Sequence, residues 1–117
     1  MIYHITTPDL WDIALSRGSY AAASLESEGF IHCSEKRQVE RSLNRFFRGE
    51  REVVILTIDP SKLICELRYE PADNDSFPHL FGELNLDAVL ATEELNPAAD
   101  GSFDFGVTGI AAEQGVQ

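Results

Sequence analysis

The sequence lacks any hydrophobic run long enough to cross a bilayer. A membrane-spanning helix needs roughly 18 or more consecutive apolar residues, and no such run occurs in the 117 residues. The opening residues, Met1 to His4, also lack the basic and apolar parts of a secretory signal. We therefore expect a cytoplasmic protein that does not insert into a membrane.

Cysteine is scarce, and Cys33 and Cys65 are the only two in the chain. One widely separated pair cannot form a zinc framework, and a reducing cytosol would keep both residues as thiols. The chain also has no His-x-x-x-His or Cys-x-x-Cys spacing, which is typical of metal sites. The sequence therefore predicts no bound metal.

Basic residues are missing from the last part of the chain. All nine lie at or before Arg68, whereas ten of the twenty acidic residues follow it, and the formal net charge is −11. This acidity disfavours general nucleic-acid binding, because a polyanion would be repelled. Residues 36–51 nevertheless carry six basic and two acidic residues, so a small anionic or nucleotide ligand is permitted there. Neither Gly-x-Gly-x-x-Gly nor a phosphate loop occurs, which excludes a Rossmann or P-loop site.

The chain does contain enough apolar material for one small domain. Hydrophobic residues make up 44% of the sequence, and the length fits a single core. We predict one compact domain over residues 1–110, followed by a frayed tail over residues 111–117.

The order of the predicted elements indicates an α+β fold. Two helices lie in the first half, from Thr7 to Gly18 and from a Ser34 cap to Gly49. Strands are predicted at residues 2–6, 30–33, 52–58 and 63–69 and within 84–91, with a polar loop at 71–78 and an edge segment or docking arm at Phe103 and Phe105. This order is typical of two N-terminal helices packed on a mostly antiparallel sheet.

The second predicted helix carries four arginines on one face. At about 100° per residue, the arginines fall opposite an apolar face. The two sets are Arg37, Arg41, Arg45 and Arg48, and Val39, Leu43, Phe46 and Phe47. One interpretation is an ordinary solvated face. The other is attraction of an anionic ligand, reinforced by Ser34 at the head of the helix, because helix N-termini bind anions.

Three histidines, His4, His32 and His79, lie in aromatic or aliphatic surroundings. They can be structural residues satisfied by backbone groups, metal ligands together with Cys33, or the base beside a Cys33 nucleophile. His32 and Cys33 are neighbours on a predicted strand, so their side chains point to opposite faces. This alternation disfavours a His32–Cys33 pair and places Ser34 on the side of His32.

Two glutamates are candidates for a functional carboxylate. Glu70 follows a predicted strand and precedes Pro71, and Glu83 follows Gly82 in a segment rich in aromatic residues. A carboxylate in such a place can bind a ribose hydroxyl or stabilise a developing cation. A surface role is the plain alternative for each.

Several segments of the chain form a recognisable pattern. They are Ile2-Tyr3-His4-Ile5-Thr6, Trp11, Gly18, Tyr20, Ser24-Leu25, Glu28-Gly29-Phe30-Ile31-His32-Cys33-Ser34, Phe77-Pro78-His79-Leu80-Phe81-Gly82 and residues 84–89. Together, up to about Leu95, they resemble a bacterial family catalogued as domain of unknown function 952. The resemblance implies a fold similar to that of ADP-ribosyltransferases, a compact split α+β sheet with a cleft for NAD.

The resemblance also implies roles for individual residues. Tyr3-His4-Ile5-Thr6 matches the Tyr-His-x-Thr strand of such transferases, in which the histidine holds a ribose of NAD. Ile31-His32-Cys33-Ser34 keeps the second histidine and the serine of the His-x-His-x-Ser strand in the RNA 2′-phosphotransferase branch, but Phe30 replaces the first histidine. The late catalytic glutamate is assigned to Glu70 in preference to Glu83. The implied catalytic residues are His4, His32 and Glu70, and the implied ligand-binding residues are Tyr3, Thr6, Ser34 and His79. Arg41 joins the ligand-binding set from the arginine face of the second predicted helix, which is compatible with a pyrophosphate ligand.

The resemblance finally implies a reaction. The chain would bind NAD as a substrate, or a related phosphorylated ribose ligand, and act as an ADP-ribosyl or RNA 2′-phosphotransferase-like enzyme. The nicotinamide–ribose bond then breaks with positive charge on the ribose, which Glu70 would stabilise while His4 positions a ribose hydroxyl. Two alternatives stay open, a non-catalytic ligand-binding or interaction module on the same fold and a metal-dependent hydrolase.

Overall fold

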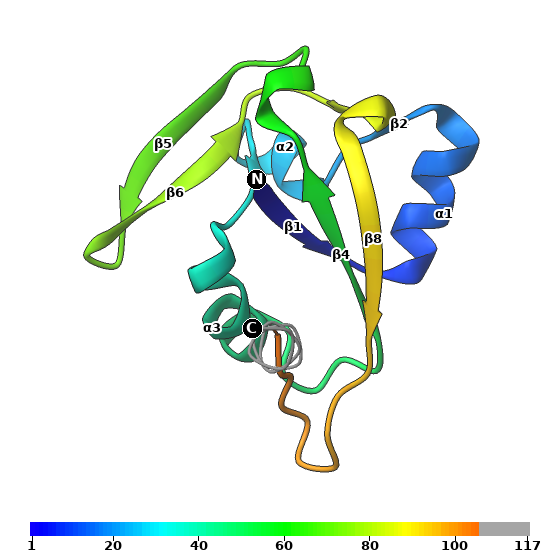
Figure 1. Ribbon diagram of the computed structural model, residues 1–117, viewed down its shortest axis with the longest axis vertical. Helices are drawn as coiled ribbons and strands as arrows, with labels where there is room; N and C mark the ends of the chain where they lie inside the picture. The colour runs from blue at the N-terminus through cyan, green and yellow to red at the C-terminus, as the bar shows by residue number, and fades with distance from the viewer. Residues whose placement is uncertain (106–117) are drawn as a thin grey trace, which may run out of the picture.

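The computed structural model describes residues 1–105 (Figure 1). The predicted tail, residues 111–117, lies outside the described residues. The helices are α1 (Pro8–Arg17), α2 (Ala23–Ser27) and α3 (Lys36–Phe46), with 3-10 turns η1 (Pro60–Lys62) and η2 (Leu86–Ala88). The strands are β1 (Ile2–Thr6), β2 (Ser19–Tyr20), β3 (Ile31–His32), β4 (Val53–Ile58), β5 (Leu67–Ala72), β6 (Asp75–Leu80), β7 (Leu84–Asn85) and β8 (Val89–Leu95).

The strands pair antiparallel in a split arrangement. One three-stranded sheet has the order β1-β4-β8, another has the order β3-β6-β5, and β2 pairs with β7. Figure 1 shows the β5–β6 hairpin splayed away from the β1-β4-β8 sheet. The predicted α+β class with mostly antiparallel strands is therefore confirmed. Among residues 1–105, no helix is both long and apolar enough to cross a membrane.

A short backbone bridge joins the two larger sheets. The N–H of Tyr3 donates to the carbonyl of Ser34 (2.8 Å), and the N–H of Ser34 donates back to Tyr3 (2.7 Å). The bridge holds β1 beside the end of β3, so residues from the start of the chain lie next to residues some thirty positions later. This junction brings the Tyr-His-x-Thr strand to the His-Cys-Ser segment.

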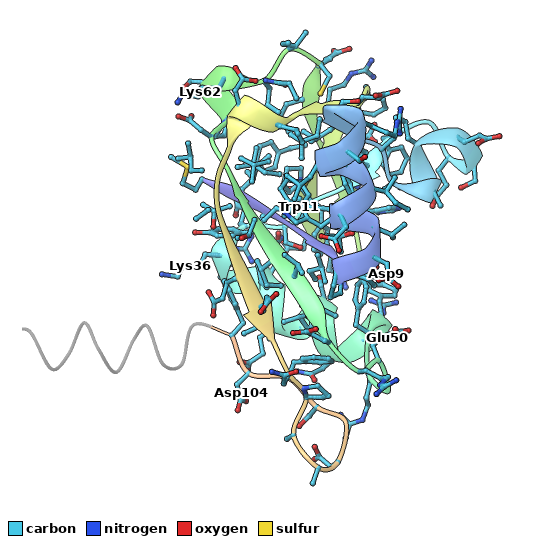
Figure 2. The ribbon with its side chains drawn as sticks, turned by 90° about the vertical axis from the view of Figure 1, so that its right-hand side faces the viewer. Asp9, Trp11, Lys36, Glu50, Lys62 and Asp104 are labelled. Atoms are coloured by element: carbon cyan, nitrogen blue, oxygen red, sulfur yellow. The ribbon has the colours of Figure 1, made fainter. Side chains whose placement is uncertain are left out.

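Strand β4 lies between two apolar cores, which explains its nearly continuous hydrophobic run. Its alternate side chains point to opposite faces. The first core contains Val54, Leu56 and Ile58 of β4 with Ile2, Ala14, Tyr20 and Ile31, and the second contains Val53 and Ile55 with Val39, Leu43 and Phe103. Helix α1 closes the first core, against which Trp11 packs (Figure 2). Helix α3 closes the second.

The two long helices begin and end by different devices. For α1, Thr7 is the N-cap and Pro8 the first residue, and Gly18 ends the helix at φ 91°, as predicted. For α3, the predicted Ser34 cap is wrong, because the backbone of Ser34 is committed to the bridge with Tyr3. Glu35 is the N-cap instead, and its N–H donates to the side chain of Gln38 (2.8 Å) in a capping box.

The predicted loop at residues 71–78 is wrong, because this segment forms the hairpin of β5 and β6. Asp73 and Asn74 have φ values of 53° and 60°, and two consecutive positive φ values are typical of a two-residue hairpin turn. The predicted strand 63–69 correspondingly begins only at Leu67. Pro78 indicates a loop in the sequence, yet it lies in the central strand β6, where its carbonyl accepts from the N–H of Cys33 (3.0 Å).

The apolar face predicted for α3 is correct except at Phe46, since Phe47 also packs against the second core. Val39 and Leu43 are fully buried, but Phe46 is 68% exposed. The space beneath the helix is filled by the arm after β8, which docks as one of the two predicted alternatives. The backbone N–H and C=O of Phe103 both bond to the Asn44 side chain (2.7 and 2.9 Å), and the Phe105 N–H donates to Glu40.

Candidate functional site

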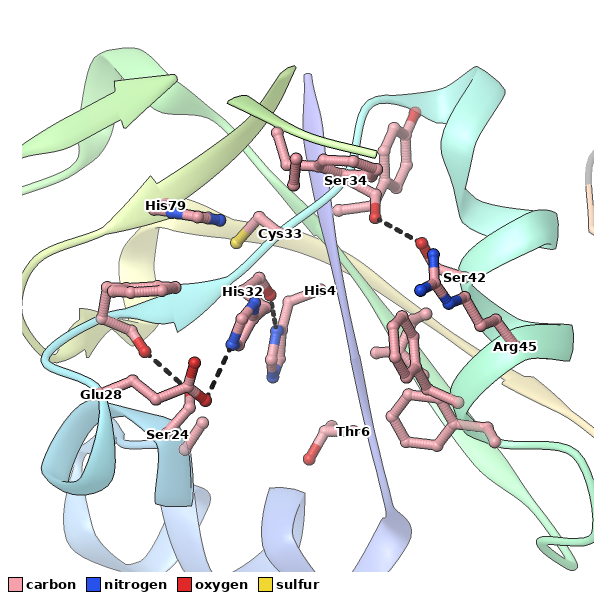
Figure 3. Close-up of a pocket in the computed structure, with 18 of the residues that line it drawn as sticks. His4, Thr6, Ser24, Glu28, His32, Cys33, Ser34, Ser42, Arg45 and His79 are labelled. Atoms are coloured by element: carbon pink, nitrogen blue, oxygen red, sulfur yellow. Dashed lines mark hydrogen bonds and ion pairs between the residues drawn. The ribbon is translucent and has the colours of Figure 1, made fainter. Parts of the chain in front are cut away.

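A cavity of about 940 Å³ opens where β1, β3, α2, α3 and the β5–β6 hairpin meet. All eight predicted site residues line it, namely Tyr3, His4, Thr6, His32, Ser34, Arg41, Glu70 and His79. In Figure 3, Glu28 and His32 approach the cavity from one side and Ser42 and Arg45 of α3 from the other. We refer to Glu28, His32, Glu70 and His79 as the histidine wall, and to Arg41 and Arg45 as the arginine wall.

The buried half of the histidine wall is the His79–Glu70 pair. Nδ1 of His79 lies 2.8 Å from a carboxylate oxygen of Glu70, and a carboxylate can only accept, so Nδ1 carries the proton. Arg68 is the residue opposite His79 in the β5–β6 register, and Glu70, two residues on, shares its face of the sheet. The Phe30 ring stacks on His79 at 4.0 Å between centroids. The stack and the carboxylate fix the ring and leave Nε2 for a ligand.

The exposed half of the wall is the His32–Glu28 pair. Nε2 of His32 lies 3.1 Å from Glu28, and about half of each side chain is exposed. His32 stands directly opposite His79 in the β3–β6 register, and the two rings meet edge to face with centroids 5.3 Å apart. Two histidine–carboxylate pairs therefore face one cavity, an arrangement suited to transferring protons.

Beneath this wall lies a buried chain of hydrogen bonds from His4. Its Nδ1 is 2.5 Å from the backbone carbonyl of His32, its Nε2 is 2.7 Å from the hydroxyl of Tyr20, and that hydroxyl is 2.9 Å from Thr6. Burial lowers the pKa of His4 to about 4, so the ring is neutral at pH 7. A carbonyl oxygen can only accept a hydrogen bond, so Nδ1 carries the proton and donates to it. The unprotonated Nε2 then accepts from Tyr20. Both ring nitrogens are occupied within the protein.

The hydroxyl of Tyr20 fits this role as a donor. Burial raises the pKa of Tyr20, so its hydroxyl stays protonated and donates the hydrogen bond to Nε2 of His4. The oxygen of Tyr20 then accepts from the Thr6 hydroxyl. The chain fixes the carbonyl of His32, and with it strand β3, on which His32 lies.

The thiol interpretation of Cys33 does not fit the site. The residue is only 3% exposed and belongs to the first core. Burial raises the pKa of its thiol far above the ordinary value, so little of the nucleophilic thiolate exists at pH 7. As predicted, His32 and Cys33 differ in exposure as neighbours on a strand do. Ser34 lines the cavity with its hydroxyl 3.5 Å from that of Ser42.

The arginine wall differs from the predicted stripe, because the acidic second half of the chain folds against it. Asp75 receives two 2.9 Å bonds from Arg37 and lies 3.5 Å from Arg41, while Asp73 pairs with Arg45. Arg41 and Arg45 still keep more than half of their side chains exposed. Ser34 lines the cavity but does not head α3, because Glu35 caps that end. Arg41 and Arg45 are the basic side chains of α3 that line the cavity.

Several residues that line the cavity were not among the predicted site residues, although most of them lie in the segments that resemble the family. Tyr20, Glu28 and Phe30 are in the quoted segments, but their pairing with histidines depends on long-range register. Arg45 and Phe77 line the cavity as well. Glu83 lies elsewhere, bonded to Arg17 (3.4 Å) and Ser19 (2.5 Å). Of the two candidate glutamates, the structure therefore brings only Glu70 to the other site residues.

The structure offers no donor set for a metal ion in the part of the chain that it describes. Within residues 1–105, no three His, Cys, Asp or Glu side chains are grouped so as to hold one. His4 is occupied by His32 and Tyr20, and Cys33 lies in the core. The metal-dependent alternative therefore has no support from the geometry.

Comparisons with known proteins place the chain in a structural group. A family model described as "Protein of unknown function (DUF952)" matches residues 5–92. The crystal structure of protein CC0527 from Caulobacter crescentus is 29% identical, covers 94% of this chain and 97% of its own, and gives a TM-score of 0.84. The solution NMR structure of CC0527 is 31% identical over 90% and 92%, with a TM-score of 0.77. No curated protein matches the chain.

Proposed function

We propose a function from the premise that the chain belongs to the DUF952 family of proteins of unknown function. The protein binds a small phosphorylated ribose compound, with NAD as the first candidate, and cleaves or transfers at the ribose. The fold is of the ADP-ribosyltransferase type. Its support is the split between the β1-β4-β8 and β3-β6-β5 sheets, with the Tyr-His-x-Thr strand at their junction.

One observation carries the proposal: the histidine wall and the arginine wall share a single cavity. Its volume of about 940 Å³ lies near the upper end of the roughly 300–1,000 Å³ usual for small-molecule sites. The phosphates of an elongated ligand lie at Arg41 and Arg45, because guanidinium groups bind phosphate oxygens with paired hydrogen bonds. The reacting ribose then lies at His32 and His79.

The reaction proposed for NAD uses the His79–Glu70 pair. The bond between nicotinamide and ribose breaks, nicotinamide leaves with the bonding electrons, and positive charge develops on the ribose. Glu70 stabilises that charge, while Nε2 of His79 takes the proton of the attacking water or hydroxyl. His4 acts by positioning β3, since both of its ring nitrogens are occupied.

Calorimetric titration of NAD and ADP-ribose tests the binding. Wild type should bind both saturably, and the Arg41→Ala/Arg45→Ala double variant should bind about tenfold or more weakly, because two charge-assisted contacts to phosphate are lost. Arg48→Ala is the matched control: it lies on the segment after α3, pairs with Asp100 and is not among the cavity residues. No binding of either ligand at millimolar concentration would sink the proposal.

A binding module without turnover is the second candidate, and one contact favours it. The Glu70 carboxylate already accepts from His79, so it is not free to approach a ribose as a lone catalytic carboxylate would. Once NAD binding is established, nicotinamide release measured by chromatography separates the two candidates. Release above the rate without protein identifies an enzyme.

A further inference from the structure

His32 and His79 are each held at one ring nitrogen and open at the other. Glu70 accepts from Nδ1 of His79, and Glu28 accepts from Nε2 of His32. Within residues 1–105, no hydrogen bond of either side chain involves the remaining nitrogen. Since the rings lie 5.3 Å apart and line the same cavity, both open nitrogens can serve one reacting centre.

We propose that these two histidines hydrolyse a phosphate ester of ribose, with nucleoside 2′,3′-cyclic phosphates as the substrate class. The inference rests on the proposed function for the choice of a phosphorylated ribose ligand. It adds a different bond, the one between phosphorus and a ribose oxygen, and assigns a separate proton-transfer role to each histidine.

Their surroundings distinguish the base from the acid. His79 is 7% exposed, is stacked on Phe30 and donates its Nδ1 proton to Glu70, which is how a carboxylate orients a histidine base. Its open Nε2 is therefore the base. His32 is half exposed and contacts Glu28 through Nε2, so we assign it as the acid, acting through its open Nδ1.

The step balances without any cofactor. Water attacks phosphorus and gives one proton to Nε2 of His79. The bond from phosphorus to one ribose oxygen breaks with its electron pair on that oxygen, which takes a proton from Nδ1 of His32. The product is a ribose phosphate monoester, and proton exchange with solvent returns both histidines to their starting states.

Two proton-transferring groups suit a phosphate ester better than the glycosidic bond of NAD. A ribose oxygen leaves poorly unless it is protonated, so the ester gains from both an acid and a base, each contributing about 10²–10⁴-fold. Nicotinamide departs as a neutral molecule and needs no proton. The geometry of two paired imidazoles is therefore used fully only when an oxygen is the leaving group.

The rest of the cavity matches a nucleoside phosphate. Arg41 and Arg45 can offset the charge of the phosphate as it gains electron density. The ring of Phe46 is 68% exposed and lies 5.1 Å from the Arg45 guanidinium carbon, so it offers a flat apolar face on which a nucleobase can stack. Substrate recognition and proton transfer then lie on opposite sides of one pocket.

Hydrolysis of adenosine 2′,3′-cyclic phosphate by the full chain tests the inference. Phosphorus NMR should show the cyclic ester replaced by a monoester, and reaction in oxygen-18 water should place one heavy oxygen on the phosphate. His79→Gln and His32→Gln should each lower the rate by about 100-fold or more. Glu83→Gln is the matched control, because it removes a carboxylate bonded to Arg17 and Ser19 outside the cavity, and should retain the wild-type rate.

Glu70→Gln tests the positioning role of the carboxylate. It should lower kcat with little change in KM and alter the pH dependence of kcat, because Glu70 orients His79 without touching the substrate. A purely structural residue would lower the melting temperature and leave the pH profile of the folded fraction unchanged. That result would overturn the role assigned to Glu70.

No monoester at millimolar substrate, or a wild-type rate in both histidine variants, overturns the hydrolysis. If His79→Gln melts early, His32→Gln carries the test, because His32 is an exposed residue. ADP-ribose titrated into the same samples separates the two proposals. Binding without ester hydrolysis overturns only this reaction, and hydrolysis without binding of NAD or ADP-ribose overturns only the NAD candidate.

Discussion

The two walls of the cavity are built in opposite ways. The histidine wall is positioned by backbone pairing, with His32 opposite His79 in the β3–β6 register and a buried chain from His4 behind it. The arginine wall consists of long side chains that are more than half exposed and contact acids of a neighbouring hairpin. The first wall is suited to proton transfer, which requires fixed distances. The second is suited to holding an anion, which requires charge and tolerates movement.

The difference extends to how each wall resists a change of conditions. The histidine wall depends on a neutral His4. Its Nδ1 donates to the carbonyl of His32 and its Nε2 accepts from the hydroxyl of Tyr20, so a proton added at Nε2 would break the second bond. The arginine wall depends on ion pairs near the surface, which salt screens. Acid should therefore weaken the first wall, and salt should weaken ligand binding at the second.

Lowering the pH should remove more stability through His4 than through any other cavity residue. Its pKa is about 4 in the folded protein, against an ordinary value of 6.5. The stabilisation is fully present above pH 6.5 and is lost as the pH falls toward 4, because the unfolded chain then binds a proton that the folded chain excludes. This difference corresponds to about 3 kcal/mol, measurable by urea unfolding at a series of pH values.

His4→Gln provides the comparison, since glutamine does not titrate. Its free energy of unfolding should change less steeply than that of wild type between pH 6.5 and 4. The bond from Arg37 holds the pKa of Asp75 well below its usual range, so stability from the ion pairs at α3 is retained above the ordinary carboxylate range and lost only below it. Parallel pH curves for wild type and His4→Gln would contradict the assignment.

Tyr20→Phe should break the same chain without removing a ring. The substitution leaves Nε2 of His4 buried without its donor, and we expect a loss of about 1–3 kcal/mol in the free energy of unfolding. Tyr69→Phe is the matched control, since Tyr69 is 48% exposed, and should change stability by no more than about 0.5 kcal/mol. Equal unfolding midpoints in urea for the two variants would show that the chain contributes nothing.

The motifs of the sequence predicted which residues gather, but not how they pair. Tyr3, His4, Thr6 and the other predicted site residues all line the cavity; most of them were implied by the family resemblance, and Arg41 by the arginine face of the second predicted helix. The pairing of Glu70 with His79 depends on the β5–β6 hairpin. The sequence predicted a loop there, because Pro71 and Pro78 are residues that are rare inside sheets. The stronger signal was the turn at 73–74, where both residues adopt a positive φ and form a tight hairpin turn. That turn joins two strands even though a proline lies in each of them.

Long-range partners also decided the errors at helix α3. Serine is a preferred N-cap residue, but the backbone N–H and C=O of Ser34 bond to Tyr3 of β1. The helix therefore begins one residue later, with Glu35 as its N-cap. Besides Glu35 at the N-cap, which contacts Arg37, the acids that cover the arginine face, Asp73 and Asp75, lie some thirty residues later in the chain. Periodicity within one element predicts which face is polar, but it contains no information about which strand will cover that face.

Asp73→Asn gives the smallest and most selective effect, at the arginine wall. It removes the carboxylate paired with Arg45, and asparagine tolerates the positive φ of 53° at this position. Stability should change by no more than about 0.5 kcal/mol, because the pair is exposed. ADP-ribose should bind about two- to fivefold more tightly, since Arg45 no longer has to exchange an internal anion for the ligand. Glu93→Gln, an equal charge change on the exposed face of β8, should leave binding unaltered, and equal tightening in both variants would reduce the effect to net charge.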